Sequence, residues 1–232
     1  YIRVLSILAP ELKNSSVPSR KFNLYKSLVN HKLLYRRFES NINKAREVYD
    51  SISDFFNNDS HFWLQYGSLE VEGAGGNLEL AENYLNQAES LNPKYHYIQN
   101  AKCNLYYKQS SSQQDYNTAL EYKQKADELG DKLLQDLSFD DAHTHHIICR
   151  GQYYFIAKWV KEPEKKKEEL SLLKSKIEKA VKLHPRDKKL DQALQAINRA
   201  YLQLGLSADS LPDPDIMDLS LIHISEPTRP RL

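Results

Sequence analysis

Apolar residues recur at every third or fourth position through most of the chain, and proline, glycine or asparagine interrupts the pattern at intervals. This spacing places apolar side chains on one face of an α-helix. The clearest stripe is formed by Leu80, Ala81, Tyr84, Leu85, Ala88 and Leu91. Asn92-Pro93 ends it, because proline cannot continue a helix. A second apolar stretch opens at Trp63, and Gly73-Ala74-Gly75-Gly76 separates the two. The pattern predicts a helix–turn–helix unit.

The same arrangement recurs along the chain at a period somewhat above 34 residues. Ala45, Ala81 and Ala119 are spaced by 36 and 38 residues, and Ala180 and Pro185 repeat the gap between Ala88 and Pro93. Small residues let antiparallel helices approach closely where they cross. The residues that we expect to pack the repeats are Trp63, Gly67, Ala81, Leu85, Ala88, Pro93, Ala119, Ala126, Gly151, Ala180 and Pro185.

The periodicity predicts an all-α protein built from antiparallel helix hairpins. Residues 2–8 fit either a strand or the remnant of a helix that ends before Pro10. The helices are expected at residues 20–38, 43–55, 59–72, 78–91, 95–109, 115–137, 141–160, 165–183 and 187–205.

The repeat resembles the tetratricopeptide family over about residues 40–205. The family pattern of an aromatic and a small residue, two alanines and a final proline is matched in order by Trp63, Gly67, Ala81, Ala88 and Pro93. The resemblance implies an α-solenoid whose concave groove binds peptides or proteins. Other copies depart from the pattern: Asn57 stands where a proline is expected, Lys123 where an aromatic is expected, and the last copy has a charged insert.

The expected organisation is the end of an upstream region with a lead-in helix at 1–40, helical repeats at 41–206 and a linker at 207–218. The chain opens at Tyr1 without an initiator methionine, which suggests a piece of something longer. Residues 219–232 resemble a translated sequencing adapter, the alternative being a natural disordered tail. Deleting these residues should leave the melting temperature unchanged.

Composition excludes several classes of protein. Among 232 residues, 32 are Lys or Arg and 31 are Asp or Glu, a balance that argues against a dedicated nucleic-acid binder. The basic stretch from Lys174 to Lys189 keeps nucleic-acid contact open as a minor alternative. No apolar run reaches the length of a membrane span, so no membrane association is expected. With two cysteines there is no disulfide framework, which favours a reducing, cytoplasmic location.

The strongest candidate for a metal or catalytic site is the segment Asp141–Cys149, where His145 and Cys149 are four residues apart and share a helix face. A zinc site needs about four ligands, and neither a HExxH nor a CxxC signature accompanies this pair. Catalysis by Cys149 and a histidine is a still weaker alternative. The plainer interpretation is a helix start capped by Asp140 or Asp141. We therefore expect no catalytic residue, no metal and no cofactor.

Two other features could indicate a binding function, one for phosphate and one for a protein partner. The run Gly73–Gly76 lacks the Lys-Ser or Lys-Thr of a phosphate-binding loop, so it is predicted to be an interhelical turn. The aromatic clusters Tyr106-Tyr107 and Tyr153-Tyr154-Phe155 are expected mainly to pack repeat against repeat. A minority of them could face the groove and contact a partner.

Two further segments, Asn23–Leu28 and His61–Tyr66, resemble the C-terminal repeats of bacterial anti-phage defence proteins, the STAND-type NTPases and their sirtuin-type relatives. The resemblance implies an NTPase and an effector domain upstream of Tyr1, and repeats that sense a phage component. The leading hypothesis is therefore a protein-binding sensor module with a protein or peptide ligand, a phage protein in this reading. The alternative is a free-standing adaptor or scaffold with a housekeeping partner. A third, distant alternative is an enzyme using His145 and Cys149.

Overall fold

The computed structural model describes residues 29–136 and 141–206. The segment 2–8, the first part of the lead-in helix at 20–28, the linker at 207–218 and the tail at 219–232 lie outside the described residues. The predictions made for them stay predictions.

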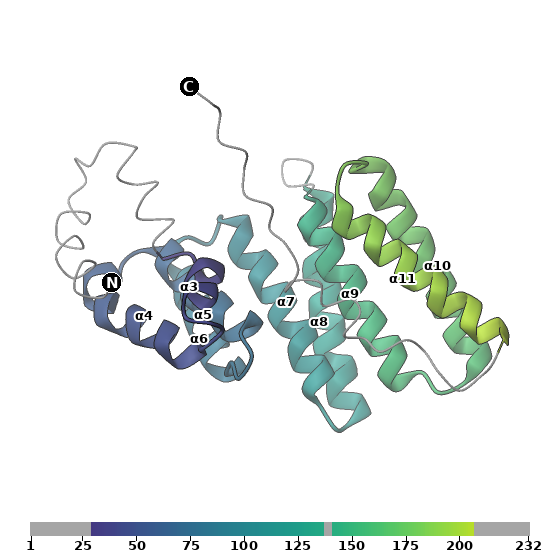
Figure 1. The fold of residues 1–232 in the computed structure, drawn as a ribbon, viewed down its shortest axis with the longest axis horizontal. Helices are drawn as coiled ribbons and strands as arrows, with labels where there is room; N and C mark the ends of the chain where they lie inside the picture. Colours follow the sequence, from purple (N-terminus) through teal and green to yellow (C-terminus); the bar gives the residue numbers. More distant parts are fainter. Residues whose placement is uncertain (1–28, 137–140, 207–232) are drawn as a thin grey trace. The chain divides into compact units, whose positions relative to one another are not determined.

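The described residues form nine helices and no strand, which confirms the all-α fold class (Figure 1). Predicted and observed bounds agree within three residues for every helix except α3. The helix expected at 20–38 is wrong at Val29 and Asn30, because Asn30 caps α3 and the helix begins at His31. Helix α10 begins two residues early, at Pro163, because proline suits the first helical position, where no backbone N–H is needed. The helices are α3 (His31–Arg37), α4 (Ile42–Phe56), α5 (Ser60–Glu72), α6 (Leu78–Leu91), α7 (His96–Ser112), α8 (Tyr116–Gln135), α9 (Ala142–Trp159), α10 (Pro163–Leu183) and α11 (Lys188–Leu206).

Short polar residues start most of these helices. An Asn or Asp side chain accepts a backbone N–H of the first turn, a cap typically worth about 1 kcal/mol. At α9 the cap is Asp141, whose carboxylate accepts from the backbone of His143 at 3.0 Å. Asp140, the other candidate, lies outside the described residues. The capping residues are Asn30, Asn41, Asp59, Asn77, Asp115, Asp141 and Asp187.

The chain divides into two compact units between Asp140 and Asp141. The first unit holds α3 to α8, and the second holds α9 to α11. In the first unit each helix packs on the next, and α3, α5 and α7 also pack on one another in sequence order. We call these three the first helices and α4, α6 and α8 the second helices. In the second unit α9 contacts both α10 and α11. Both units therefore follow the contact pattern of stacked helix hairpins.

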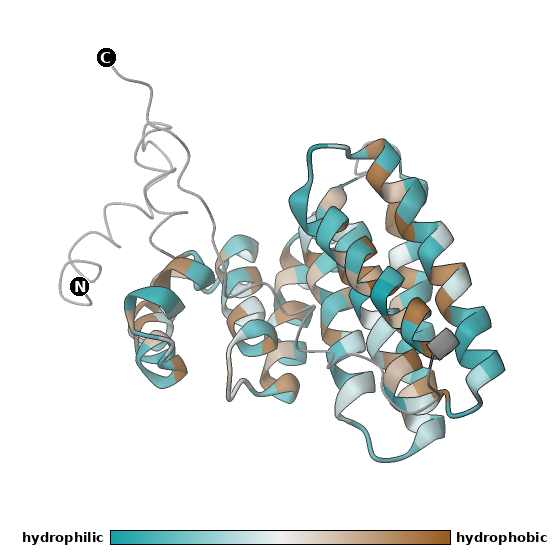
Figure 2. Ribbon diagram, turned by 45° about the vertical axis from the view of Figure 1, so that its right-hand side comes forward, coloured by the Kyte–Doolittle hydropathy of each residue, from teal (hydrophilic) through white to brown (hydrophobic). Residues whose placement is uncertain are grey.

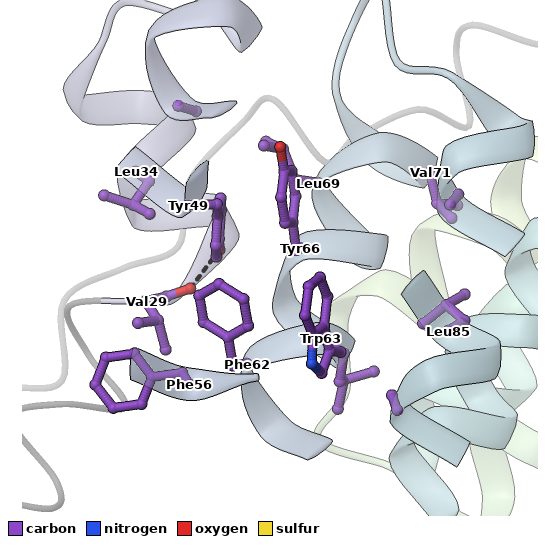
Figure 3. Packing of buried hydrophobic residues seen from close by; sticks show 14 of the residues in the cluster. Val29, Leu34, Tyr49, Phe56, Phe62, Trp63, Tyr66, Leu69, Val71 and Leu85 are labelled. Atoms are coloured by element: carbon purple, nitrogen blue, oxygen red, sulfur yellow. Dashed lines mark hydrogen bonds between the residues drawn. The ribbon is translucent and has the colours of Figure 1, made fainter. Parts of the chain in front are cut away.

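Aromatic side chains dominate the core of the first unit. Figure 3 shows the ring of Phe62 between those of Phe56 and Trp63, with centroids 5.9 Å and 5.0 Å away. Tyr49 is fully buried, and its hydroxyl donates to the backbone oxygen of Val29. Its ring stacks on Tyr66 at 4.5 Å. These contacts join α4 to α5 and fix the register of the hairpins.

Aliphatic side chains dominate the core of the second unit. All three helices contribute, through buried residues such as Ile156 of α9, Ile177 of α10 and Ile197 of α11. Figure 2 shows brown and teal residues alternating along each helix, and no helix is brown throughout. Each helix of the second unit thus has an apolar stripe that it buries against its neighbours.

Candidate functional site

The hairpin of α5 and α6 is built on a close crossing at Gly67. A Cβ atom at this position would lie 2.7 Å from Cγ of Leu85 and 3.3 Å from the backbone oxygen of Ala81. Ala81, Leu85 and Ala88 are fully buried. The absence of a side chain at Gly67 therefore lets α6 approach α5 to within contact of its backbone.

The helices α7 and α8 also cross closely, but other small residues lie at their crossing. Cys103 and Ser110, seven residues apart on α7, are buried against Ala126 and Ala119, seven apart on α8. The Cys103 thiol lies 3.3 Å from the backbone oxygen of Ala126, and the Ser110 hydroxyl donates to that of Ala119 at 2.7 Å. Sequence reasoning missed both α7 residues, since neither glycine nor alanine marks the crossing. Burial raises the pKa of Cys103, so its thiol stays protonated.

The remaining packing candidates divide between buried residues in the helices and exposed prolines outside them. Ala45 on α4 and Ala180 on α10 are fully buried, and Gly151 on α9 is buried. Pro93 and Pro185 are exposed and lie just after α6 and α10 end. Trp63 is buried, and its indole N–H donates to the backbone oxygen of Asn57 at 2.8 Å.

Lys123, the departure from the expected aromatic, takes part in a polar contact across the α7–α8 hairpin. Its Nζ lies 2.6 Å from Oδ2 of Asp127, one turn further along α8. The other carboxylate oxygen of Asp127 accepts a 2.5 Å hydrogen bond from the hydroxyl of Tyr107 on α7. The second helix is thus tied to the first by a charged hydrogen bond where the repeat pattern expects an aromatic ring.

The glycine-rich turn between α5 and α6 is anchored by a buried ion pair. The Glu70 side chain is fully buried and receives two hydrogen bonds from Arg46, at 2.7 Å and 2.6 Å. Glu70 also accepts from the backbone N of Asn77 at 2.8 Å, while Arg46 donates to the oxygen of Gly75 at 3.2 Å.

The same turn requires glycine at two positions. Gly75 has a φ of 78°, and a Cβ on Gly76 would lie 2.0 Å from the oxygen of Glu70. The geometry is that of an interhelical turn held from inside.

Two polar networks join neighbouring hairpins. On α3 the ring of His31 lies 2.8 Å from the amide oxygen of Gln65 and 3.3 Å from a carboxylate oxygen of Glu72, which ties α3 to α5. On α7 the ammonium of Lys102 contacts α6, at 2.7 Å from Glu89.

The pKa of Glu89 reflects that contact. Burial by itself raises the pKa, but hydrogen bonds from Lys102 and Gln99 outweigh it and hold the pKa below its usual range. The carboxylate therefore stays charged and keeps α6 tied to α7.

The aromatic clusters named from the sequence divide between buried and half-buried positions. Tyr107, Tyr153 and Phe155 are buried, whereas Tyr106 and Tyr154 are half-buried. Most of these rings therefore pack inside their units.

The structure places His145 and Cys149 in different surroundings. Cys149 belongs to the buried core of the second unit, and burial raises its pKa to about 12. His145 is half-buried, and its ring centroid lies 5.5 Å from that of His184 at the end of α10. In residues 29–136 and 141–206, no three His, Cys, Asp or Glu side chains gather to hold a metal ion. Burial thus favours the protonated thiol of Cys149, whereas nucleophilic catalysis uses the thiolate.

The end of the second unit around the α10–α11 turn is strongly basic. Its exposed cations, which we call the basic segment, are Lys176, Lys179, Lys182, Arg186, Lys188 and Lys189. On the neighbouring α9, the buried His146 has its pKa lowered to about 3, first by burial and then by the positive charges of Arg150, His143 and Lys189. The sequence alone had indicated this stretch, though only as a minor feature.

No described helix is both long enough and apolar enough to cross a membrane. Comparison with protein-family models, with curated proteins and with solved structures gives no match to this chain.

Proposed function

We propose that this chain is a protein-binding helical-repeat module and that its first helices contact the partner. The observation that carries the proposal is the layer formed by α3, α5 and α7, each packed on the next and backed by second helices. A layer of neighbouring helices can present side chains from several repeats to one ligand, which is how stacked repeats bind extended partners. Here the exposed side chains come from α3 and α7, because every residue of α5 is buried or half-buried. Leu33 on α3 and Tyr97 on α7 are about half exposed and offer apolar anchor area.

Site-specific photo-crosslinking tests this proposal. A benzophenone amino acid is placed at Leu33 or at Tyr97, and matched probes are placed at Leu80 and Tyr116, which are exposed on second helices. We expect one protein to crosslink from both first-helix positions and from neither second-helix position. The crosslinked protein is then purified and its Kd is measured directly. Equal crosslinking from all four positions would contradict binding through the first helices.

We further propose that the module is the sensor region of a larger bacterial defence NTPase. The support is the sequence resemblance of residues 61–66; the other resembling segment, 23–28, lies outside the described residues. Phe62, Trp63 and Tyr66 also pack the core of the first unit, so packing alone accounts for part of that resemblance. A long sequencing read through the native locus is the test. An in-frame upstream P-loop NTPase supports the sensor, and a short reading frame supports the free-standing adaptor instead.

A further inference from the structure

Positive and negative charges separate between the two units. Residues 29–136 contain 11 Lys and Arg against 16 Asp and Glu, whereas residues 141–206 contain 14 against 8. The near-neutrality of the whole chain, which argued against a dedicated nucleic-acid binder, therefore conceals an acidic described part of the first unit and a basic described part of the second. For binding, the charge of the compact unit that meets the ligand matters more than the total.

The cations of the second unit concentrate in the basic segment. Lys176, Lys179 and Lys182 follow each other at three-residue spacing, which makes them neighbours on the surface of α10. Arg186 and Lys188 continue the series through the turn into α11, and all five are exposed.

The carboxylates among these cations have contacts of their own. Glu178 lies 3.9 Å from Lys174, one turn away along α10. Asp187 caps α11 by accepting from the backbone N of Lys189 and of Leu190, both at 2.9 Å. Asp191 is exposed in the first turn of α11 and is the next acidic residue along the chain. The segment from 174 to 189 thus presents seven cations against two carboxylates.

The types of residue favour a phosphate backbone as the ligand. Eleven of the 14 cations in residues 141–206 are lysines, which act as point charges and suit repeated phosphates without reading sequence. In this unit the exposed large apolar side chains that the structure describes are Leu172, Leu183 and Leu202. Its described aromatic rings are half-buried, such as Tyr201 and Trp159, or buried, which disfavours stacking on unpaired bases. An acidic protein partner would instead favour aromatic anchors at the centre of the contact.

We propose that the second unit binds the phosphate backbone of double-stranded nucleic acid, independently of sequence, through the basic segment at the α10–α11 turn. At about 1.5 Å per residue, Lys176 and Lys182 lie about 9 Å apart along α10. A duplex carries about one charge per 1.7 Å of its axis, so this length runs beside several phosphates. The proposal stands apart from protein binding through the first helices.

The test measures binding of the full chain to a fluorescein-labelled 30-base-pair DNA duplex of mixed sequence, by anisotropy, from 50 to 250 mM NaCl. The variant combines Lys176→Glu, Lys179→Glu and Lys182→Glu. The matched control carries Lys44→Glu, Lys94→Glu and Lys132→Glu, three exposed lysines of the first unit with the same change in charge.

We expect wild-type affinity to fall steeply with salt. The basic-segment variant should lose at least about tenfold in affinity at 100 mM NaCl and flatten the slope of log K against log salt by about 2 to 3, because three phosphate contacts are lost. The control should change affinity less than about threefold. A second variant carries Lys→Gln at the same three positions and should lose less affinity than the Glu variant. Circular dichroism shows whether each variant is folded, and the Gln variant is used alone if the Glu variant unfolds.

Several results would overturn the proposal. One is that the wild type shows no saturable binding to the duplex at 50 mM NaCl. Another is that the variant and the control lose the same amount of affinity. Displacement of the duplex by poly-glutamate as efficiently as by unlabelled duplex would assign the segment to acidic proteins. Binding to phosphatidylserine vesicles without binding to the duplex would assign it to a membrane surface.

Discussion

The two units apply one packing rule with different side chains. In the first unit, stacked aromatic rings and a buried ion pair join the hairpins, and the described residues are net acidic. In the second, aliphatic residues and alanines fill a three-helix core, and the described residues are net basic. Helix hairpins need only a complementary stripe between neighbours. The outer surface and the polar contacts are then free to differ, and these decide what each unit can bind.

The different cores of the two units also predict which substitutions and which pH change destabilise each unit. The first unit depends on polar groups that must stay paired inside, and the second depends on a histidine that must stay neutral. Hydrogen exchange measured on peptides from each unit reports these free energies locally in the full chain.

The largest expected effect comes from Arg46→Met. It leaves the fully buried Glu70 carboxylate without its counter-charge, which should lower the free energy of opening measured on α4 to α6 by about 3–5 kcal/mol. Adding Glu70→Met should restore much of the loss, because an apolar pair removes the unpaired charge. Lys44→Met, at an exposed position on the same helix, is the control. A loss similar to that of the control would mean that Glu70 is not held as a buried anion.

Gly67→Leu should destabilise the α5–α6 hairpin by about 1–3 kcal/mol through overpacking against Leu85. Ala81→Leu should act in the same direction. Gln87→Leu, exposed on α6, should stay within about 0.5 kcal/mol. Denaturant unfolding gives the values. A melting temperature unchanged by both core substitutions would mean that the repeat register is wrong.

Acidification should destabilise the second unit through His146. Its pKa in the folded protein is about 3, below the ordinary value of 6.5, so the unfolded chain takes up a proton first as pH falls. The free energy of unfolding of the second unit should therefore decrease as pH falls below about 6.5, and the decrease should reach about 2 kcal/mol at pH 5. His146→Gln should remove this part of the pH dependence, as read from α9 peptides.

The control for that measurement is His96→Gln, at the start of α7 in the first unit. It should leave the pH dependence of the α9 peptides as in the wild type. If His146→Gln and the wild type lose the same free energy between pH 7 and pH 5, His146 is not the group responsible.

The smallest effect concerns the departure from the repeat pattern at Lys123. Tyr107→Phe removes the hydrogen bond to Asp127 and should cost about 1.5 kcal/mol, since the acceptor is charged. Tyr106→Phe, half-buried on the same helix, is the control and should stay within about 0.5 kcal/mol. Thermal unfolding of the three proteins separates these cases. Equal melting temperatures would show that the Tyr107–Asp127 contact adds no stability.

Much of the fold follows from local sequence signals. Helix positions come from the apolar period, starts from Asn and Asp caps, and ends from residues such as Pro93. Each of these signals acts within a few residues of the position that it determines. The interhelical turn at Gly73–Gly76 also follows from a local signal, because the backbone conformation and close contacts of the turn require glycine.

Other features could not be read from the sequence because they join residues far apart in the chain. Arg46 and Glu70 are 24 residues apart, and neither stands out from the many charged residues around it. Cys103 and Ser110 were missed because a crossing needs small volume, which several residue types provide.

By itself, the sequence determined the helical periods, the caps and the close approach of α5 and α6 at Gly67. Only the tertiary structure decided where one compact unit ends and the next begins, which buried charges are paired, and that the boundary separates an acidic described part from a basic one. The physical reason is range. Hydrogen bonds along a helix and backbone preferences act over a few residues, whereas burial and electrostatics depend on which distant segments meet.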